Sequence, residues 1–238
     1  MCIEASNETL PLVIKFKVWG ALRFLSHAEM LRVFQRACVR AGVNVQYSRG
    51  FNPRPKLSLP LPRPVGVESE DEVLSVRCSI PDARYSTRNT HDAIRNTIKA
   101  GLSAQLPEGC ELLSVRVAES AASIRPRSAT YILPVKPEHL YDALGSTIDR
   151  LLASECLTVR RKTHAKKRQT RDDRRGTRIK NIDVRGFLAS LEMTGEGIIV
   201  ECKISPAGSI RIDEVLSLLQ LDQSKLAGPI RRTSVQWQ

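Results

Sequence analysis

Apolar and polar positions follow two different periods between residues 13 and 42. Residues 13–19 are mostly apolar and basic in turn, a period of two that predicts a half-exposed strand. Ser26 stands three residues before Glu29, which is the spacing of a capping box, so we expect a helix to begin there. The apolar positions that recur at helical spacing are Leu31, Phe34, Cys38 and Ala41. Gly42 then predicts the end of the helix.

Later changes of period predict the other elements of a first half over residues 11–120, preceded by a flexible tail at 1–10. These elements are strands at 43–48, 57–61 and 72–80, a helix at 90–106 and a closing strand at 112–118. Prolines at 60, 62 and 64 favour an edge or a bulge near the second of these strands. With one additional strand between the two helices, this order is that of the ferredoxin-like motif, which is strand, helix, strand, strand, helix, strand.

A similar order recurs in a second half over residues 128–238. Its predicted elements are strands at 129–135, 156–160, 179–184, 187–193, 198–204 and 230–237, with helices at 138–153 and 212–221. A polar interruption at about 160–180 separates two of these strands. We therefore predict the α+β class, with two tandem ferredoxin-like (βαββαβ) halves, antiparallel sheets and a basic insertion in the second half.

Charge changes this picture, because the net charge is +12 and the pI is about 9.8. A field of this size favours a polyanionic partner, above all RNA or DNA, although a basic protein kept soluble by its charge is an alternative. The start of the chain is acidic and lacks the apolar core of a signal peptide, and no apolar run has the length of a membrane span. We expect a cytoplasmic protein that does not bind a membrane.

Two groups of cations are candidates for contact with nucleic acid. Arg32, Arg36 and Arg40 form a stripe along the first predicted helix. Residues 160–180 hold eleven Lys or Arg against two Asp and no aromatic residue, so this arm would grip phosphate without reading sequence. The candidates in the arm are Arg160, Arg161, Lys162, Lys166, Lys167, Arg168, Arg171, Arg174 and Arg175. A solvated loop without a partner is the alternative for the arm.

A loop rich in Gly and Pro at 48–56 is a candidate for binding a phosphate or a carboxylate. Its candidate ligands are Ser48, Gly50, Asn52, Arg54 and Lys56, and Arg23 is a further candidate. The alternative is a plain turn with Phe51 plugging the core. His27 follows the helix cap, where a neutral imidazole is a candidate general base or phosphate ligand, or simply part of the cap. We expect one pocket to be lined by Arg23, His27, Asn52, Arg54 and Lys56.

The six cysteines are widely spaced, and no two form a Cys-x-x-Cys pair, so the sequence predicts no metal site and no cofactor in this chain. Most of them read as small buried apolar residues.

Several segments together carry a resemblance to a known family. They are Arg23-Phe24-Leu25-Ser26-His27, the run from Tyr47 to Ser58 with its Gly-Phe-Asn-Pro-x-Pro-Lys core, Pro64 to Ser69, Ile182 to Arg185, and Arg231 to Thr233. This pattern resembles the radical SAM-linked proteins, which are encoded beside, or fused to, radical S-adenosylmethionine proteins. The resemblance implies a radical SAM partner that carries the iron–sulfur cluster and S-adenosylmethionine, and a role in RNA modification or processing.

Three functions follow as hypotheses. The first is an accessory module without activity of its own, which binds RNA for the radical SAM enzyme. The second is a metal-independent RNA endonuclease with His27 as general base, by analogy with tandem ferredoxin-like endonucleases of CRISPR systems. The third is a pure interaction subunit of the radical SAM enzyme that never contacts RNA.

Overall fold

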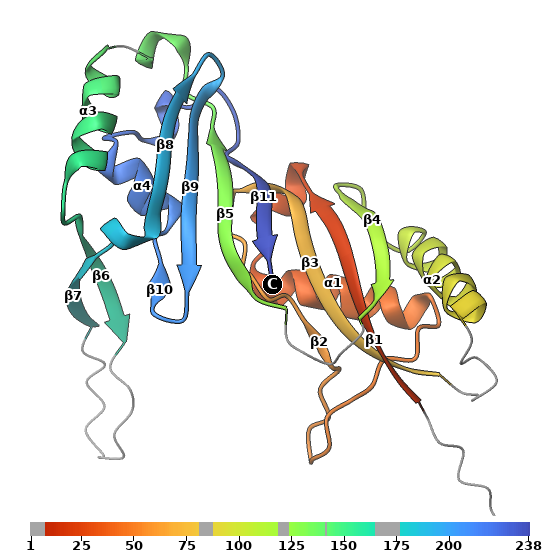
Figure 1. The fold of residues 1–238 in the computed structure, drawn as a ribbon. Coiled ribbons are helices and arrows are strands. Elements are labelled where there is room, and N and C mark those ends of the chain that lie inside the picture. Colours follow the sequence, from red (N-terminus) through yellow and green to blue (C-terminus); the bar gives the residue numbers. More distant parts are fainter. Residues whose placement is uncertain (1–7, 81–87, 119–123, 141, 165–176) are drawn as a thin grey trace, which may run out of the picture. The chain divides into compact units, whose positions relative to one another are not determined.

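The computed structural model describes residues 8–80, 88–118, 124–140, 142–164 and 177–238 (Figure 1). These residues form a mixed α+β fold with four α-helices and mostly antiparallel strands, which confirms the predicted class. The chain divides into two compact units, one of residues 1–127 with 229–238 and the other of residues 128–228. The tandem ferredoxin-like arrangement of the halves stays a prediction.

The first unit places its helices on an antiparallel sheet. Its elements are β1 (Glu8–Val18), η1 (Gly20–Phe24), α1 (His27–Arg40), β2 (Leu57–Ser58), β3 (Glu68–Ile80), α2 (Arg88–Ser103), β4 (Cys110–Val117) and β11 (Arg231–Trp237). Strand β1 lies between β3 and β4, and β2 pairs with the far edge of β3, with all these pairs antiparallel. Strand β11 joins the start of β3 in parallel, so the predicted closing strand of the second half groups with the first unit.

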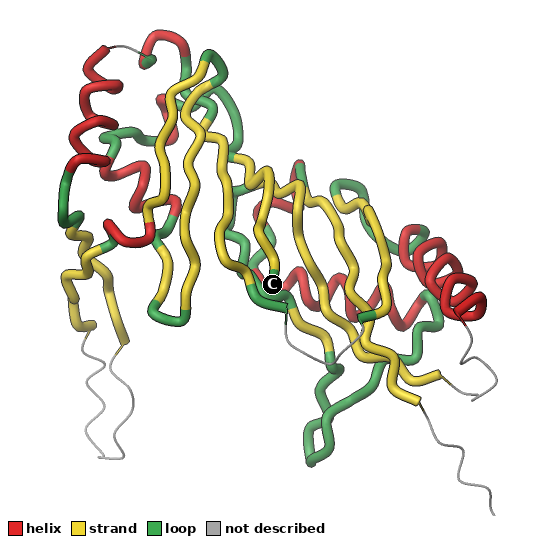
Figure 2. Tube along the Cα trace, in the orientation of Figure 1, coloured by secondary structure: helices red, strands yellow, loops and turns green. Residues whose placement is uncertain are grey.

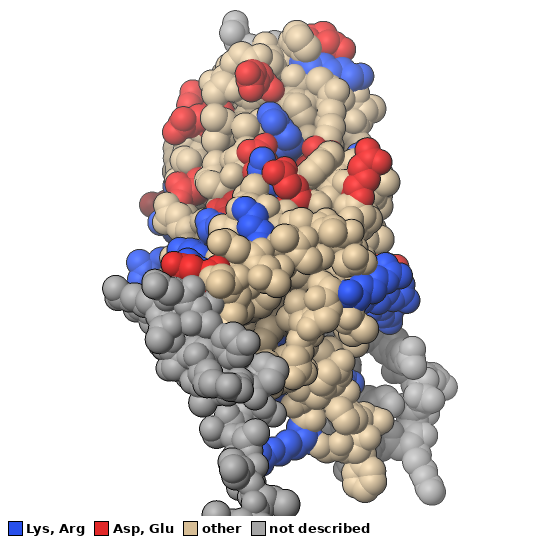
Figure 3. Space-filling view, turned by 90° about the vertical axis from the view of Figure 1, so that its right-hand side faces the viewer, with Lys and Arg blue, Asp and Glu red and all other residues tan. Residues whose placement is uncertain are grey.

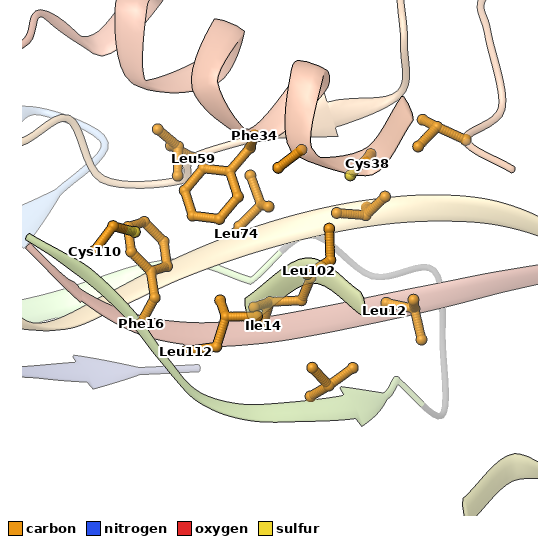
Figure 4. Close-up of a cluster of buried hydrophobic side chains, with 14 of the residues drawn as sticks. Leu12, Ile14, Phe16, Phe34, Cys38, Leu59, Leu74, Leu102, Cys110 and Leu112 are labelled. Carbon is orange, nitrogen blue, oxygen red and sulfur yellow. The ribbon is translucent and has the colours of Figure 1, made fainter. Parts of the chain in front are cut away.

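The core of the first unit lies between α1 and this sheet. Alternate residues of β1 point to one face, and Ile14 and Phe16 are buried there against Phe34 of α1. The rings of Phe16 and Phe34 meet edge to face with centroids 4.6 Å apart. Figure 4 shows Phe34 and Cys38 pointing from the helix toward the strands. This packing fixes which face of α1 is left for solvent.

Helix α1 confirms the predicted capping box. The amide of Glu29 donates to the hydroxyl of Ser26, and the amide of Ser26 donates to the carboxylate of Glu29 at 2.8 Å. The buried stripe is turned slightly from the predicted one. It consists of Met30, Phe34, Ala37 and Cys38, while Leu31 and Ala41 are only partly buried.

The segment predicted as strands at 43–48 and 57–61 differs most from expectation. Only isolated bridges occur at Val45 and Tyr47, and β2 has just two residues. The reason is local chemistry, because Pro55, which faces Tyr47, and Pro60, which lies inside the second predicted strand, lack the amide that a ladder needs. Residues 47–57, up to and including the first residue of β2, therefore form a long loop, which is drawn mostly green in Figure 2 below the position of β2 in Figure 1. At the start of the chain, residues 8–10, predicted as part of a tail, belong to β1.

The second unit is built around β9. Its elements are β5 (Pro126–Leu133), η3 (Pro137–His139), α3 (Asp142–Ala153), β6 (Thr158–His164), β7 (Thr177–Asp183), η4 (Arg185–Phe187), β8 (Leu188–Thr194), β9 (Gly197–Ser205), β10 (Gly208–Ser209), α4 (Ile212–Leu218) and η5 (Gln223–Lys225). Strands β5, β8 and β10 each pair with β9 in antiparallel fashion. Strands β6 and β7 form a separate hairpin that carries the two ends of the basic insertion. Among the helices of the described ranges, none is long and apolar enough to cross a membrane.

Candidate nucleic-acid interface

The face of α1 opposite the core carries a row of arginines. Arg32, Arg36 and Arg40 are all exposed, and they follow one another at four-residue spacing, about 6 Å apart along the helix axis. Within the described residues, no hydrogen bond or ion pair holds any of these three guanidinium groups. Their exposed positions agree with the predicted stripe, and its contact with nucleic acid stays a prediction.

The loop at 47–57 has a defined internal structure. The amide of Ser48 donates to the carbonyl of Arg54 at 2.8 Å, and the amide of Arg54 donates back to the hydroxyl of Ser48 at 2.9 Å. One step closer to the sheet, the amide of Lys56 donates to the carbonyl of Gln46 at 2.7 Å. The two sides of the loop are thus tied at its base, and Pro53 and Pro55 restrict the backbone of the returning side.

The tip of this loop presents polar, cationic and aromatic groups to solvent. Arg49, Asn52 and Arg54 are exposed, and Phe51 is 105% exposed. Phe51 therefore does not plug the core, which was the alternative for this loop. Gly50 has a φ of 139°, a conformation that residues with a side chain rarely adopt, so a glycine is required where the chain turns at the tip.

A groove connects the base of this loop with α1. It has a volume of about 410 Å³ and is lined by Gln35, Val39, Gly42, Val43, Asn44, Val45, Tyr47, Pro55 and Leu57. Val39 is 67% exposed and Tyr47 is 46% exposed, so the groove has apolar walls that are open to solvent. Arg36 is a surface neighbour of Val39, three positions before it on the helix. The arginine row and the loop therefore border the same hollow.

His27 lies at the other end of α1. It is twelve positions before Val39, which corresponds to about 18 Å along the helix axis. The cavity beside His27 has a volume of about 10 Å³, room for about one water molecule. The Nδ1 atom of His27 is buried and has no hydrogen-bond partner within the described part of the chain. The sequence led us to expect His27 and the loop in one pocket. The structure does not bring them together.

Arg23, also predicted for that pocket, is held near the start of α1. Its guanidinium donates to the carbonyl of Gly20 at 2.9 Å and lies 3.7 Å from the carboxylate of Glu68. It also stands over the ring of Phe24, 4.5 Å from the centroid. These contacts satisfy the Arg23 side chain inside the unit and orient the segment that precedes the helix cap.

Other arginines of the first unit hold its strands together. Arg232 on β11 is fully buried and forms an ion pair with Glu72 of β3, while its Nε donates to the hydroxyl of Ser69 at 3.3 Å. Arg63 donates to several backbone carbonyls before α1, including that of Arg23 at 2.7 Å. Burial lowers the pKa of Arg63 although the charge of Glu72 opposes this.

The acidic run at 68–72 forms the first residues of β3. The carboxylate of Asp71 pairs with Lys15 at 2.9 Å, in addition to the contacts of Glu68 and Glu72. Glu70 lies 3.6 Å from Arg231. The sequence missed these contacts because each joins residues more than forty positions apart.

In the second unit, the hairpin of β6 and β7 carries the described part of the basic insertion. Arg161 faces inward, and its Nε and Nη2 donate to both carboxylate oxygens of Glu214 at 2.6 and 2.7 Å. Arg161 therefore has a structural role that the sequence did not indicate. Arg160 and Lys162 are exposed and share the other face of the hairpin. Lys166, Lys167, Arg168, Arg171, Arg174 and Arg175 lie outside the described residues.

Arg185, from one of the segments that carry the family resemblance, closes the end of α3. Its guanidinium donates to the carbonyls of Leu152 at 2.7 Å, Ser154 at 2.9 Å and Leu188 at 3.0 Å. The carboxylate of Asp183 accepts the amide of Arg185 at 3.0 Å, and backbone hydrogen bonds lower the pKa of this carboxyl. This segment thus serves the fold.

The cysteines of the described residues are mostly buried as thiols. Burial raises the pKa of Cys38 to about 11 and that of Cys78 and Cys202 to about 12. Among the described residues, no group of three or more His, Cys, Asp or Glu side chains is arranged to hold a metal ion. Protonated thiols are poor ligands, because metals bind the thiolate.

Basic side chains are not spread evenly over the surface. In the upper part of the face drawn in Figure 3, Lys and Arg side chains lie beside Asp and Glu side chains, whereas lower on this face basic side chains lie apart from acidic ones. In the first unit, the arginines of α1 and of the adjoining loop are exposed and form no ion pair within the described residues.

The fold and the site define a class: an α+β protein whose first unit displays arginines and an aromatic side chain on a helix and an adjoining loop. A family model matches residues 12–212, so the chain belongs to the family described as "Uncharacterized protein conserved in bacteria (DUF2344)". The matched range includes α1, the loop at 47–57 and both strands of the basic hairpin. No curated protein matches the chain.

Proposed function

We propose that the protein binds RNA and that α1 with its adjoining loop is the binding surface. The observation that carries this proposal is the row Arg32, Arg36 and Arg40, which is exposed at one-turn spacing and whose guanidinium groups make no hydrogen bond or ion pair within the described residues. Arginine suits this role, since its planar guanidinium donates to phosphate oxygens in pairs. Arg49 and Arg54 extend the cationic surface onto the loop.

The exposed residues of the β6–β7 hairpin supply a second set of phosphate contacts in this proposal. Arg160, Lys162 and Lys180 are exposed there. Arg161 is excluded from this set, because Glu214 already binds its guanidinium in a bidentate ion pair.

We further propose that the bound RNA is presented to a radical SAM enzyme, in modification or processing of that RNA. The support is the sequence resemblance through the loop motif at 47–58 and through Ile182 to Arg185. In this proposal the partner carries the iron–sulfur cluster and S-adenosylmethionine.

The proposal is tested by measuring the affinity for total cellular RNA across a salt series. The site variant is Arg32→Ala with Arg36→Ala and Arg40→Ala. A control variant with the same loss of charge replaces three exposed cations elsewhere, Arg116, Arg150 and Lys203, by alanine. Loss of three phosphate contacts lowers the slope of log affinity against log salt by about 2 for a single strand.

We expect this change of slope in the site variant and a smaller change in the control. Equal losses in both variants would show that net charge, rather than this surface, holds RNA. Failure of the wild-type chain to bind RNA at moderate salt would refute the proposal and leave the interaction subunit, to be sought by co-purification with the radical SAM protein.

The endonuclease hypothesis has less support from the geometry. The cavity at His27 has space for about one water molecule, whereas a phosphodiester and its flanking sugars need several times that volume. The hypothesis predicts metal-independent RNA cleavage that disappears in His27→Ala. RNA that stays intact during incubation with the wild-type chain would remove it.

A further inference from the structure

We propose that the loop at 47–57 binds unpaired bases, so that the substrate class is single-stranded or looped RNA rather than continuous duplex. This inference rests on the proposed RNA-binding function. Its starting point is Phe51, whose side chain is 105% exposed at the tip of a loop that extends from the sheet (orange in Figure 1). An aromatic ring in this position loses water contact only when a partner covers it.

The charge around Phe51 indicates what that partner is. Arg49 and Arg54 are exposed on either side of the tip, and Asn52 follows Phe51 directly. An apolar protein partner would leave these cations unmatched, whereas an RNA strand offers a base for the ring and phosphates for the arginines. Proteins that hold single strands combine stacking rings with a cationic surface in this way.

Hydrogen bonds and a proline restrict the conformation of the loop next to its tip. The reciprocal hydrogen bonds between Ser48 and Arg54, at 2.8 and 2.9 Å, tie the two sides together just below the tip. Pro53 fixes φ on the returning side. A ring carried on such a loop loses little conformational freedom on binding, so more of the stacking energy remains as affinity.

The groove at the base of the loop offers a second place for a base. Tyr47 is 46% exposed in a hollow of about 410 Å³, which accommodates a nucleobase. Gln35 and Asn44 are among the residues that line the same hollow, and both residues carry a side-chain amide that donates and accepts hydrogen bonds. Stacking on an aromatic ring together with hydrogen bonds to base edges is how proteins read unpaired RNA.

Duplex RNA cannot use these features, because its bases are stacked on each other and its major groove is deep and narrow. The arginine row on α1 would still contact duplex phosphates. The two parts of the surface thus have separable roles: α1 supplies affinity for any RNA, and the loop supplies preference for unpaired bases.

The test measures dissociation constants for a single-stranded RNA of about 20 nucleotides, long enough for one such site, and for the duplex of the same sequence. We expect the wild type to prefer the single strand. Phe51→Ala should weaken single-strand binding about 5- to 100-fold and leave duplex binding nearly unchanged. Phe51→Tyr, which keeps a stacking ring, should retain the preference for the single strand.

A direct signature comes from Phe51→Trp. The new indole should lose fluorescence when a single strand is added, beyond any change that the native Trp19 and Trp237 give in the wild-type chain. Quenching by the single strand and not by the duplex would place an unpaired base on residue 51.

The failures are distinguishable. If the wild type binds single strand and duplex equally and Phe51→Ala changes neither, the inference is wrong while RNA binding by α1 stands. If Phe51→Ala leaves RNA affinity intact but abolishes co-purification with a protein, the loop is a protein-docking element and the inference is again wrong. If the wild type binds neither RNA, the proposed function itself has failed.

Discussion

Two sets of arginines in this protein have opposite surroundings. The engaged arginines, Arg63, Arg161, Arg185 and Arg232, donate to carboxylates or backbone carbonyls inside their own unit. The exposed arginines, Arg32, Arg36, Arg40, Arg49 and Arg54, lie on α1 and the loop at 47–57 and have no such partner within the described residues. The same side chain holds the fold in one region and faces solvent in the other.

This difference shows why the net charge of +12 is a poor guide to a binding site. An arginine that is paired with a carboxylate or with carbonyls inside the fold would have to break those contacts to bind phosphate, and breaking a buried ion pair leaves a buried charge alone. Only the exposed set can exchange water and counterions for phosphate at little cost. The comparison therefore predicts large stability effects and no specific binding effects for the first set, and the reverse for the second.

The largest expected effect is on the buried pair of Arg232 and Glu72. In Glu72→Gln, the buried guanidinium loses its counter-charge, so we expect the free energy of unfolding to fall by about 3–5 kcal/mol. Urea denaturation measures this loss. The matched control is Glu70→Gln on the same strand, whose ion pair with Arg231 is solvent-exposed and worth less than about 1 kcal/mol. Similar losses in the two variants would contradict the assignment of a structural role to Arg232.

The next effect concerns Arg161 and Glu214 and depends on pH. Burial alone would raise the pKa of Glu214, but hydrogen bonds from Arg161 and from the amide of Arg211 bring it below the ordinary 4.5. A carboxyl with a lowered folded-state pKa stabilises the fold above the unfolded-state pKa. That contribution is lost as the pH falls through the folded-state pKa.

We therefore expect Glu214→Gln to cost about 2 kcal/mol at neutral pH, the value of a hydrogen bond between charged groups. The difference between wild type and variant should shrink as the pH is lowered below 4.5, the ordinary pKa of the group. Thermal unfolding of both chains at a series of pH values measures it. A difference that is independent of pH in this range would show that the ion pair is not the cause.

A smaller effect is expected at the start of α1, which orients the exposed row. Ser26→Ala removes the acceptor for the Glu29 amide, and loss of a helix cap costs about 1 kcal/mol. Ser26→Asp keeps an acceptor at the cap and should cost less. Chemical denaturation compares the two variants, and an equal loss in both would mean that the hydroxyl is not acting as a cap.

The smallest stability effect belongs to the exposed row itself. Arg36→Ala removes a side chain with no internal partner, so the free energy of unfolding should change by less than about 0.5 kcal/mol. The same substitution should weaken RNA binding and reduce its salt dependence. A clear loss of stability would show that Arg36 has a structural role, like the engaged arginines, and would contradict the division into two sets.

The sequence predicted best where the causes are local. The capping box of Ser26 and Glu29, the strand at β1 and the exposed positions of Arg32, Arg36 and Arg40 follow from spacing alone, and the structure has all of them. Alternation and helical period depend on neighbours within a few residues, which a single sequence displays.

The prediction from sequence failed where interacting residues are far apart along the chain. Arg232 meets Glu72 across 160 positions, and Arg161 meets Glu214 across 53, so no local pattern marks either arginine as structural. Arg161 was therefore grouped with the phosphate-binding arm. The expected pocket of His27 and the loop was a similar error. The loop lies near one end of α1 and His27 at the other, and tertiary packing, which no sequence motif displays, decides this.

Arginine reactivity measures the difference between the two sets most directly. The chain is treated with phenylglyoxal, which modifies accessible guanidinium groups, with and without single-stranded RNA, and each site is quantified by mass spectrometry. We expect Arg32, Arg36, Arg40, Arg49 and Arg54 to react in the free protein and to be protected by RNA, while Arg161 and Arg232 react slowly in both states. Exposed arginines that react equally with and without bound RNA would contradict the account.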